Sequence, residues 1–214
     1  MQRIQEEALY TYCEKYSTPE ASWLVQASQN TFEKTRQPYM LSGHLQGRVL
    51  SLISTLIKPT NILEIGTFTG YSAMCLAEGL DPQGRLITID NSKENIALSE
   101  AHIAASPYAK QIQILFGDAK DILPTLSQKF DLVFIDADKQ GYSKYLDLVI
   151  EKMNVGACLL ADNVLFKGEV LNLEQAGKFA KALHAYNEKI NQDPRLENVL
   201  LPIRDGIMIS RKKY

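Results

Sequence analysis

Acidic side chains stand at the ends of five apolar runs in this sequence. They are Glu64, Asp90, Asp118, Asp136 and Asp162. A single acid after one strand is commonplace, because aspartate caps helices, but acids after five runs are harder to explain in this way. In open parallel sheets, ligands bind outside the carboxyl ends of the strands. The acids therefore predict a ligand site at that end of such a sheet.

Two of these acids could hold a metal ion. Asp136 and the pair Asp162-Asn163 follow apolar runs that should form neighbouring strands, and they offer two carboxylates and an amide oxygen. Hard oxygen ligands with no paired cysteine or histidine suit Mg²⁺, Mn²⁺ or Ca²⁺, and three of them leave positions for water or a chelating substrate. The alternative is that Asp162 and Asn163 only begin a turn, and this pair alone is weak evidence for a metal.

A glycine loop follows the first of the apolar runs. The run over residues 62–65 breaks at Gly66 and Gly70 and continues as a helical pattern, which predicts a strand, a tight loop and a helix N-terminus. Asp90 lies roughly twenty residues downstream, where an acid in a nucleotide-binding unit hydrogen-bonds ribose hydroxyls. The first half of the chain is therefore predicted to bind a nucleoside.

The spacing of the two glycines argues against a dinucleotide. A G-x-G-x-x-G loop uses its second glycine to let the backbone approach a pyrophosphate, whereas Thr67 and Phe68 occupy the middle of this loop. Glu64 beside the loop would repel phosphate and attract a cation. A positively charged nucleoside without phosphates fits better, and S-adenosylmethionine carries an ammonium and a sulfonium. The alternative is a plain strand-to-helix turn with a surface acid.

The elements that position these residues alternate between strand and helix after Pro59. The expected strands cover residues 61–65, 86–90, 112–116, 131–136 and 157–162, followed by 197–203 and 206–211. Continuous apolar runs are typical of strands buried on both faces, and the Asp205-Gly206 pair predicts a terminal hairpin. The fold class is therefore α/β: a Rossmann-like, doubly wound sheet of seven strands with a C-terminal antiparallel hairpin, as in class I methyltransferases.

Three helices should form a lead-in over residues 1–57, ahead of a Rossmann-like core over 58–214. They are expected at 2–16, about 20–34 and about 45–57, and Thr18-Pro19-Glu20 should open the second. The third has an apolar face made of Leu45, Val49, Leu52, Ile53 and Leu56. Such a lead-in can cover a ligand site or form an oligomer contact.

The composition is that of one globular domain over 1–214. The chain is 45% hydrophobic and 22% charged, with a net charge of -2 and scattered Lys and Arg, so nucleic acid is not expected as a partner. It has no apolar signal region and no run of about 18 apolar residues, so no membrane segment is expected. Its three widely spaced cysteines fit free thiols in a reducing cytosol, which predicts a cytoplasmic protein.

The histidines and the N-terminal aromatic residues have less certain roles. His44 could contact the substrate or cofactor but is better explained as structural, and His102 and His184 are expected to be surface residues of helices. Trp23 with Tyr10, Tyr12 and Tyr16 could form a platform for an aromatic substrate, yet aromatic residues at helical spacing more often belong to a helix interface.

In combination, these motifs resemble the cation-dependent O-methyltransferases related to caffeoyl-CoA and catechol O-methyltransferases. The resemblance spans about Met40 to the hairpin, and its motifs are Met40, E-I-G-T-F-T-G-Y-S, Gly117-Asp118-Ala119, D-A-D-K-Q-G-Y and Asp162-Asn163-Val164. It implies that the methionine part of S-adenosylmethionine is held by Glu64, Gly66, Thr67 and Ser72. It further implies that Asp90 binds the ribose, that Asp118 and Ala119 flank the adenine, and that Met40 and Ser42 line the pocket.

By the same resemblance, Asp136, Asp162 and Asn163 would bind the metal and Lys139 would act beside them, with Asp136 also bordering the cofactor. A homodimer is implied as well. A phenolic hydroxyl has a pKa of about 10, so little phenolate exists at neutral pH. A metal bound by two adjacent oxygens lowers that pKa and orients the nucleophile, and Lys139 could take the proton or stabilise the phenolate.

We therefore expect an O-methyltransferase that depends on S-adenosylmethionine and a divalent cation, Mg²⁺ first, and that methylates a small aromatic with vicinal oxygens, such as a catechol or caffeoyl-type compound. A nicotinamide-dependent oxidoreductase is the first rival; the missing pyrophosphate glycine and the terminal hairpin argue against it. The second rival is a binding module that binds the cofactor but catalyses no reaction. The intact set of acid, amide and lysine side chains argues against it. A nucleic-acid methyltransferase lacks the basic surface it would need.

Overall fold

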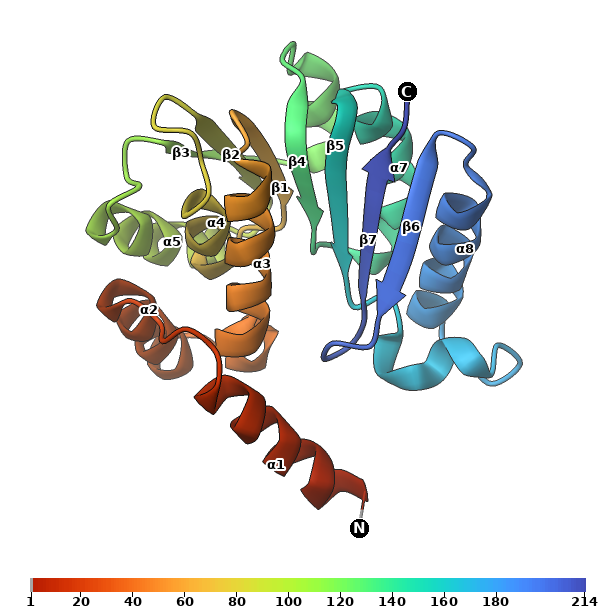
Figure 1. The fold of residues 1–214 in the computed structure, drawn as a ribbon, viewed down its shortest axis with the longest axis horizontal. Coiled ribbons are helices and arrows are strands. Elements are labelled where there is room, and N and C mark those ends of the chain that lie inside the picture. The colour runs from red at the N-terminus through yellow and green to blue at the C-terminus, as the bar shows by residue number, and fades with distance from the viewer. Residues whose placement is uncertain (1) are drawn as a thin grey trace.

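The computed structural model describes the backbone of residues 2–214 and the side chains from Ala8 onward. One seven-stranded sheet organises it, in the order β3-β2-β1-β4-β5-β7-β6 (Figure 1). The strands are β1 Asn61–Ile65, β2 Arg85–Asp90, β3 Ile112–Phe116, β4 Phe130–Ile135, β5 Met153–Asp162, β6 Leu196–Leu201 and β7 Ile207–Lys212. Strands β1 to β5 run parallel, and β7 is antiparallel to both of its neighbours. The predicted fold class and hairpin are confirmed.

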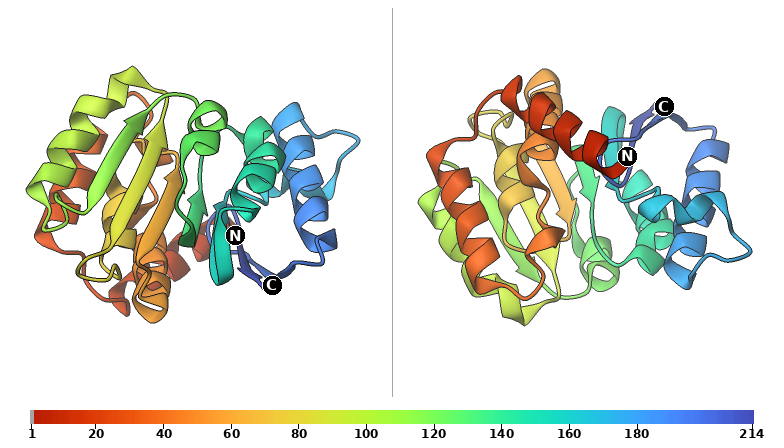
Figure 2. Two further views of the ribbon diagram at one scale, coloured as in Figure 1. Left: turned by 90° about the horizontal axis from the view of Figure 1, so that it is seen from above. Right: turned by 90° about the horizontal axis from the view of Figure 1, so that it is seen from below.

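Helices cover both faces of the sheet (Figure 2). The α-helices are α1 Gln2–Lys15, α2 Ser22–Lys34, α3 Gly43–Ile57, α4 Tyr71–Ala77, α5 Lys93–Ala105, α6 Ala119–Ile122, α7 Tyr142–Ile150 and α8 Lys178–Gln192. Short 3₁₀ turns are η1 Pro38–Met40, η2 Leu123–Thr125, η3 Lys139–Gly141 and η4 Phe166–Leu171. One apolar core joins the sheet to α2, α3, α4 and α5, and the other joins it to α6, α7 and α8. No helix among the described residues is long and apolar enough to cross a membrane.

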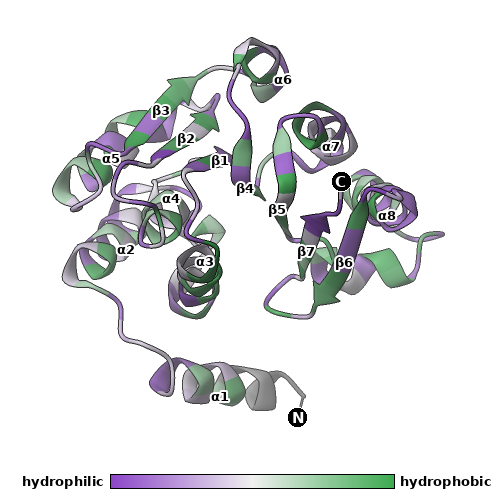
Figure 3. Ribbon diagram, turned by 45° about the horizontal axis from the view of Figure 1, so that its top comes forward, coloured by the Kyte–Doolittle hydropathy of each residue, from purple (hydrophilic) through white to green (hydrophobic). Residues whose placement is uncertain are grey.

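The central strands send alternate side chains into the two cores. In β4, Leu132 and Phe134 pack into the first core, whereas Val133 and Ile135 pack into the second. Successive strand residues point to opposite faces, so a strand covered on both sides must be apolar throughout. The outer helices are amphipathic and show both hydrophilic and hydrophobic residues in Figure 3; α8 buries Ala180, Leu183 and Tyr186 at helical spacing.

The third helix does not bury the apolar face that the sequence shows. Leu52 and Leu56 are 61% and 75% exposed. The buried face of α3 is instead small and polar, and it consists of Gln46, Gly47, Leu50, Ser51 and Ser54. Its small residues let α4 approach closely: a Cβ on Gly47 would lie 2.9 Å from the Tyr71 ring. Ile53 packs against the core, so the described residues leave uncovered only an apolar stripe of α3 made of Leu52 and Leu56.

Several predicted element ends differ from the structure, including ends of α2, β5 and β6. Helix α2 begins at Ser22 with no side-chain cap, because Glu20 accepts a hydrogen bond from the Tyr71 hydroxyl at 2.5 Å instead of starting the helix. Strand β5 begins at Met153 rather than at 157; its residues 154–156 are exposed and include a single large apolar side chain, Val155, and its register shifts there against β4. Strand β6 ends at Leu201, and the hairpin turn closes with a hydrogen bond from Gly206 N to Ile203 O at 2.9 Å.

Candidate active site

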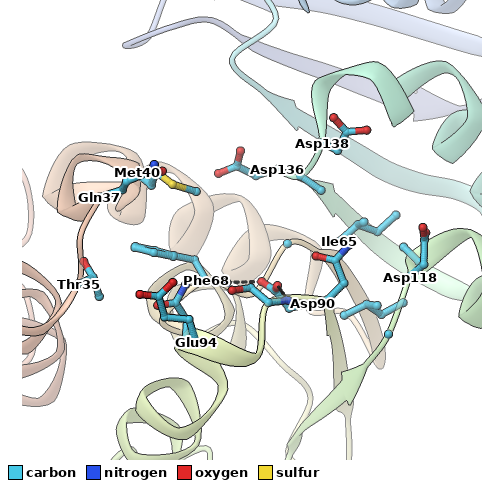
Figure 4. Close-up of a pocket in the computed structure, with 18 of the residues that line it drawn as sticks. Thr35, Gln37, Met40, Ile65, Phe68, Asp90, Glu94, Asp118, Asp136 and Asp138 are labelled. Atoms are coloured by element: carbon cyan, nitrogen blue, oxygen red, sulfur yellow. Dashed lines mark hydrogen bonds between the residues drawn. The ribbon is translucent and has the colours of Figure 1, made fainter.

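The strand order reverses at β1, because β2 and β3 lie on one side of it and β4 and β5 on the other. Ligands bind at such a switch point, outside the carboxyl ends of the strands. A cavity of about 430 Å³ lies there. In Figure 4, Met40 and Asp136 lie on one side of it and Phe68 and Asp90 on the other. Six of the predicted cofactor residues line this first cavity: Met40, Gly66, Asp90, Asp118, Ala119 and Asp136.

Asp90 orders the glycine loop that borders this cavity. Its Oδ2 accepts hydrogen bonds from the backbone N–H groups of Thr67 at 3.0 Å and Phe68 at 2.8 Å. Its Oδ1 accepts one from Ser92 N at 2.8 Å. A carboxylate has about four lone-pair sites, so acceptor capacity remains for a ribose hydroxyl.

Gly66 is required by the packing of the protein rather than by a ligand. Its φ is +105°, and a Cβ there would lie 1.9 Å from the carbonyl oxygen of Asp136. The loop after β1 therefore packs directly against the end of β4. This contact places Asp136 beside the first cavity.

Glu64 is fully buried behind the loop, which excludes the surface acid weighed above. Its Oε2 accepts a hydrogen bond from Thr88 Oγ1 at 2.5 Å, while its Oε1 has no hydrogen-bond partner among the described residues. Burial raises the pKa of Glu64 to about 8, the neighbouring Ser72 and Thr88 hydroxyls oppose this rise, and the charges of Asp136 and Asp90 add to it. A buried, unpartnered carboxylate oxygen favours a proton or a cationic ligand group as its neighbour.

A second cavity of about 290 Å³ adjoins the first and shares Met40, Gly66 and Asp136 with it. The other predicted site residues that line it are Ser42, Thr67, Ser72, Lys139, Asp162 and Asn163. Phe166 of η4 adds an aromatic wall. A reacting group at the boundary of the two cavities would face the polar cluster described next.

Lys139 lies at the centre of that cluster. Its Nζ donates to Asp136 Oδ1 at 2.8 Å, to Asn163 Oδ1 at 2.6 Å and to the Tyr142 hydroxyl at 2.9 Å. Tyr142 in turn donates to the backbone oxygen of Asp162 at 2.9 Å. Burial, with the charges of Asp136 and Asp162, raises the pKa of Tyr142, so this hydroxyl keeps its proton.

The three predicted metal ligands come from the ends of neighbouring strands. Asn163 adopts a left-handed conformation, with φ at 61°, and its side-chain oxygen reaches the same ammonium as Asp136. Asp162 is buried: its Oδ2 accepts from Gln46 Nε2 at 2.8 Å and its Oδ1 from Asn163 N at 2.7 Å. Burial and the charge of Asp136 raise the pKa of Asp162 to about 6, while Gln46 and Lys139 oppose the rise.

The predicted ligand set contains an amide, so it differs from a purely acidic or histidine site. Among the described residues, no group of three or more His, Cys, Asp or Glu side chains could hold a metal ion. The chain brings together two carboxylates, one amide oxygen and an ammonium that donates to Asp136 and Asn163.

The sequence assigned no definite role to several residues of the site, among them Asp138, which could position Lys139 or cap a helix. Asp138 lines the first cavity and accepts from Gln140 N at 3.4 Å, so it caps η3. Tyr142 was part of a motif without a role, and Gln46 and Arg204 gave no local signal at all. Their partners are far away in the sequence.

The histidines and N-terminal aromatics are placed as follows. The prediction for His102 was wrong: it is buried, and its Nδ1 lies 2.9 Å from Thr69 O, so it supports the glycine loop. His44 is structural, with Nε2 2.8 Å from Thr18 O. Trp23 packs edge-on against Tyr108. Neither Trp23 nor the three N-terminal tyrosines line the two cavities.

Comparison with known proteins fits this geometry. The family model described as O-methyltransferase matches residues 14–213. The chain is 31% identical over 192 residues to a catechol O-methyltransferase from Niastella koreensis, covering 88% of this chain and 85% of the relative. It is 31% identical over 221 residues to a caffeoyl-CoA O-methyltransferase from Eucalyptus gunnii, covering 98% and 89%.

A solved structure of similar shape is the SAH-bound methyltransferase PaMTH1 from Podospora anserina, with a TM-score of 0.92 and 28% identity over 100% of this chain and 97% of that one. The match extends from the cofactor loop to the terminal hairpin, which a dinucleotide oxidoreductase would not share. The chain therefore belongs to the O-methyltransferase family of S-adenosylmethionine-dependent enzymes.

Proposed function

We propose that this protein transfers a methyl group from S-adenosylmethionine to a hydroxyl of a small aromatic with two vicinal oxygens, of the catechol or caffeoyl type, with the help of a divalent cation. One observation carries the proposal. Asp136, Asp162 and Asn163 all line the second cavity, where the Lys139 ammonium donates to Asp136 Oδ1 and Asn163 Oδ1, and Asp136 also lines the first cavity.

The cofactor proposal is supported by the first cavity and by Glu64. S-adenosylhomocysteine is the product that S-adenosylmethionine leaves after methyl transfer, and the Podospora anserina relative is described as bound to it. Here Met40, Gly66 and Asp136 line the cavity, and the Oε1 of Glu64, buried behind the loop, has no hydrogen-bond partner within the part of the chain that the structure describes. A ligand with an ammonium and a sulfonium suits that charge.

The donor set fits a hard cation. Lys139 Nζ lies within hydrogen-bond distance of Asp136 Oδ1 and Asn163 Oδ1, so a positive charge between these oxygens is already compatible with the fold. Asp136, Asp162 and Asn163 would hold Mg²⁺, with Mn²⁺ or Ca²⁺ as alternatives. When bound, the cation would lower the pKa of a phenolic hydroxyl and fix two vicinal oxygens.

The residues of the chain have separable roles. Phe166 would border the acceptor in the second cavity, and Asp136, which lines both cavities, would border both the nucleoside and the acceptor. Lys139 is held by three acceptors, which places its ammonium where it can stabilise phenolate charge or, after losing its proton, accept one. Tyr142 fixes the lysine from the protein side.

A methyl-transfer assay tests this proposal. Purified protein is incubated with S-adenosylmethionine and a panel of catechols, caffeoyl compounds and single-hydroxyl phenols, with Mg²⁺ and with EDTA. We expect methylation of the vicinal compounds only, lost with EDTA and restored by Mg²⁺. Equal turnover of single-hydroxyl phenols, or full activity in EDTA, would contradict the proposed chemistry.

We also propose that the protein is a cytoplasmic homodimer. The uncovered stripe of α3 and the exposed Leu9, Tyr12 and Tyr16 of the α1 region support an oligomer contact. The buried Cys75 and Cys158 are unbridged, as expected for a reducing compartment.

A further inference from the structure

A glutamine of the N-terminal lead-in contacts one of the proposed cation ligands, Asp162. Gln46 comes from the first turn of α3, is fully buried, and lies 116 residues from its partner Asp162 in the sequence. Its Nε2 donates to Asp162 Oδ2 at 2.8 Å. Its Oε1 accepts from Arg204 Nη1 at 3.2 Å.

The orientation of this amide is decided by its neighbours. Arg204 has only donors, so the atom facing it must be the amide oxygen. The amide nitrogen is then the atom facing Asp162. A buried amide without partners is unfavourable, and here both ends are paired. Gln46 is therefore a neutral bridge between a guanidinium and a carboxylate.

The bridge fixes Asp162. With Gln46 on Oδ2 and the backbone N–H of Asn163 on Oδ1, each carboxylate oxygen is held by one donor. The carboxylate cannot rotate about its last side-chain bond without breaking one of these bonds. Asp136 is a like charge close enough to act on it, and an unheld Asp162 would turn away from that charge.

Arg204 links the same bridge to the cofactor side. Besides Gln46, its Nη1 donates to the backbone oxygens of Leu41, at 2.9 Å, and of Ser42. These two residues directly follow Met40, which lines both cavities. The turn between β6 and β7 thus holds the Met40 segment and the Gln46 amide with one side chain.

We propose that Gln46 is a positioning residue for the cation site: it holds Asp162 in the orientation that binds the metal, and Arg204 orients Gln46. This inference rests on the proposed cation dependence. Removing a group that orients a metal ligand typically weakens metal binding by 10- to 100-fold.

Binding of Mn²⁺ to the full-length protein, measured by electron paramagnetic resonance without substrate, tests the inference. We expect Gln46→Met, which keeps the side-chain length without the hydrogen bonds, to bind Mn²⁺ at least about 10-fold more weakly than wild type. The matched control is Ser54→Ala, which removes a buried hydrogen bond of the same helix, from Oγ to Leu76 O at 2.6 Å, away from the site. It should bind Mn²⁺ as wild type does.

The measurement separates this inference from the proposed function. If wild type itself binds no Mn²⁺, the cation proposal fails. If wild type binds it and Gln46→Met binds equally well, only the role of Gln46 is overturned. Calorimetry with S-adenosylmethionine should show nearly unchanged affinity in Gln46→Met, and a loss of affinity for both ligands would contradict a role specific to the cation.

A second variant covers the case in which Gln46→Met does not fold. Gln46→Asn keeps an amide, but its side chain is one methylene too short to reach both partners. Its Mn²⁺ affinity should therefore fall between those of wild type and Gln46→Met, and an affinity equal to that of wild type would overturn the inference.

Arg204→Met should weaken Mn²⁺ binding less than Gln46→Met does. In the double variant, Arg204→Met should cause no further loss beyond that of Gln46→Met. Additive losses would show that Arg204 does not act through Gln46.

Discussion

At the scale of single residues, the polar cluster balances like charges with one ammonium. Asp136 and Asp162 repel one another, and burial penalises both. Lys139 offsets this by donating to Asp136, while Gln46 and the backbone N–H of Asn163 donate to Asp162. These hydrogen bonds hold the negatively charged oxygens close together. A cation site requires such preorganised ligands before the ion binds.

Removing one carboxylate should therefore separate metal use from cofactor binding. In Asp162→Ala or Asp136→Ala, we expect Mg²⁺-dependent methylation to fall by roughly 100-fold or more, because the cation loses a charged ligand. Calorimetry should still detect S-adenosylmethionine binding, weakened in part for Asp136→Ala because that residue borders the first cavity. Asp147→Ala, which removes a surface acid paired with Lys189, is the control. Full activity in either site variant would remove the metal hypothesis.

The raised pKa of Glu64 predicts that a proton is released when the cofactor binds. Its pKa is raised to about 8 in the free protein, so the carboxyl holds a proton at pH 7. A cationic ligand beside it favours the ionised form, and the proton should leave as the ligand binds. Calorimetry at pH 7 in buffers with different ionisation enthalpies should show different heats for wild type and equal heats for Glu64→Gln. Equal heats for wild type would contradict this role.

The raised pKa of Glu64 also makes the free energy of unfolding depend on pH. Because the folded pKa of about 8 lies above the ordinary value of 4.5, the folded state binds more protons than the unfolded state between these pH values. The free energy of unfolding should therefore decrease as pH rises through that window. The decrease should be smaller in Glu64→Gln, as measured by urea unfolding without ligand.

At the scale of elements, the loop between β1 and α4 is fitted to the end of β4. Gly66 has a positive φ and its missing side chain leaves room for the Asp136 carbonyl oxygen. The loop is held from outside by Asp90 and by His102. One short connection thus determines where the cofactor cavity, Asp136 and the adjoining second cavity meet.

Gly66→Ala should disrupt this fit. A methyl group at 1.9 Å from a backbone oxygen must displace the loop or β4, in addition to the strain of about 1–3 kcal/mol at a positive φ. We expect a loss of stability of more than about 3 kcal/mol together with loss of cofactor binding. Gly156→Ala, at φ +84° with nothing within 4 Å of the new Cβ, isolates the strain alone. Similar urea midpoints for both variants would argue against the close approach.

At the scale of the whole molecule, the lead-in helices have two faces with different tasks. The inner face of α3 contributes Gln46 to the site, and its outer face leaves Leu52 and Leu56 exposed. Apolar side chains grouped on an outer face are typical of protein interfaces. This division supports the proposal that the lead-in both completes the site and joins two copies.

Sedimentation should test whether the lead-in helices join two copies of the chain. We expect wild type to sediment at twice the 24.0 kDa chain mass, and Leu52→Asp with Leu56→Asp to shift it to the monomer, because a charge in an apolar contact is unfavourable. Val155→Asp, at an equally exposed apolar residue of β5, should not change the mass. A monomeric wild type, or a dimer that survives both aspartates, would contradict this interface.

The sequence by itself determined the strands, the loop and the acids at the strand ends, because apolar runs and glycine breaks are local signals. Tertiary structure decided which face of α3 is buried, since a helical stripe shows that a partner exists but not which one. It also decided that Glu64 and His102 are buried, and that Gln46 meets Asp162 and Arg204. Those contacts join segments more than 100 residues apart in the chain, and no local pattern records a contact that only the packing of sheet, lead-in and hairpin creates.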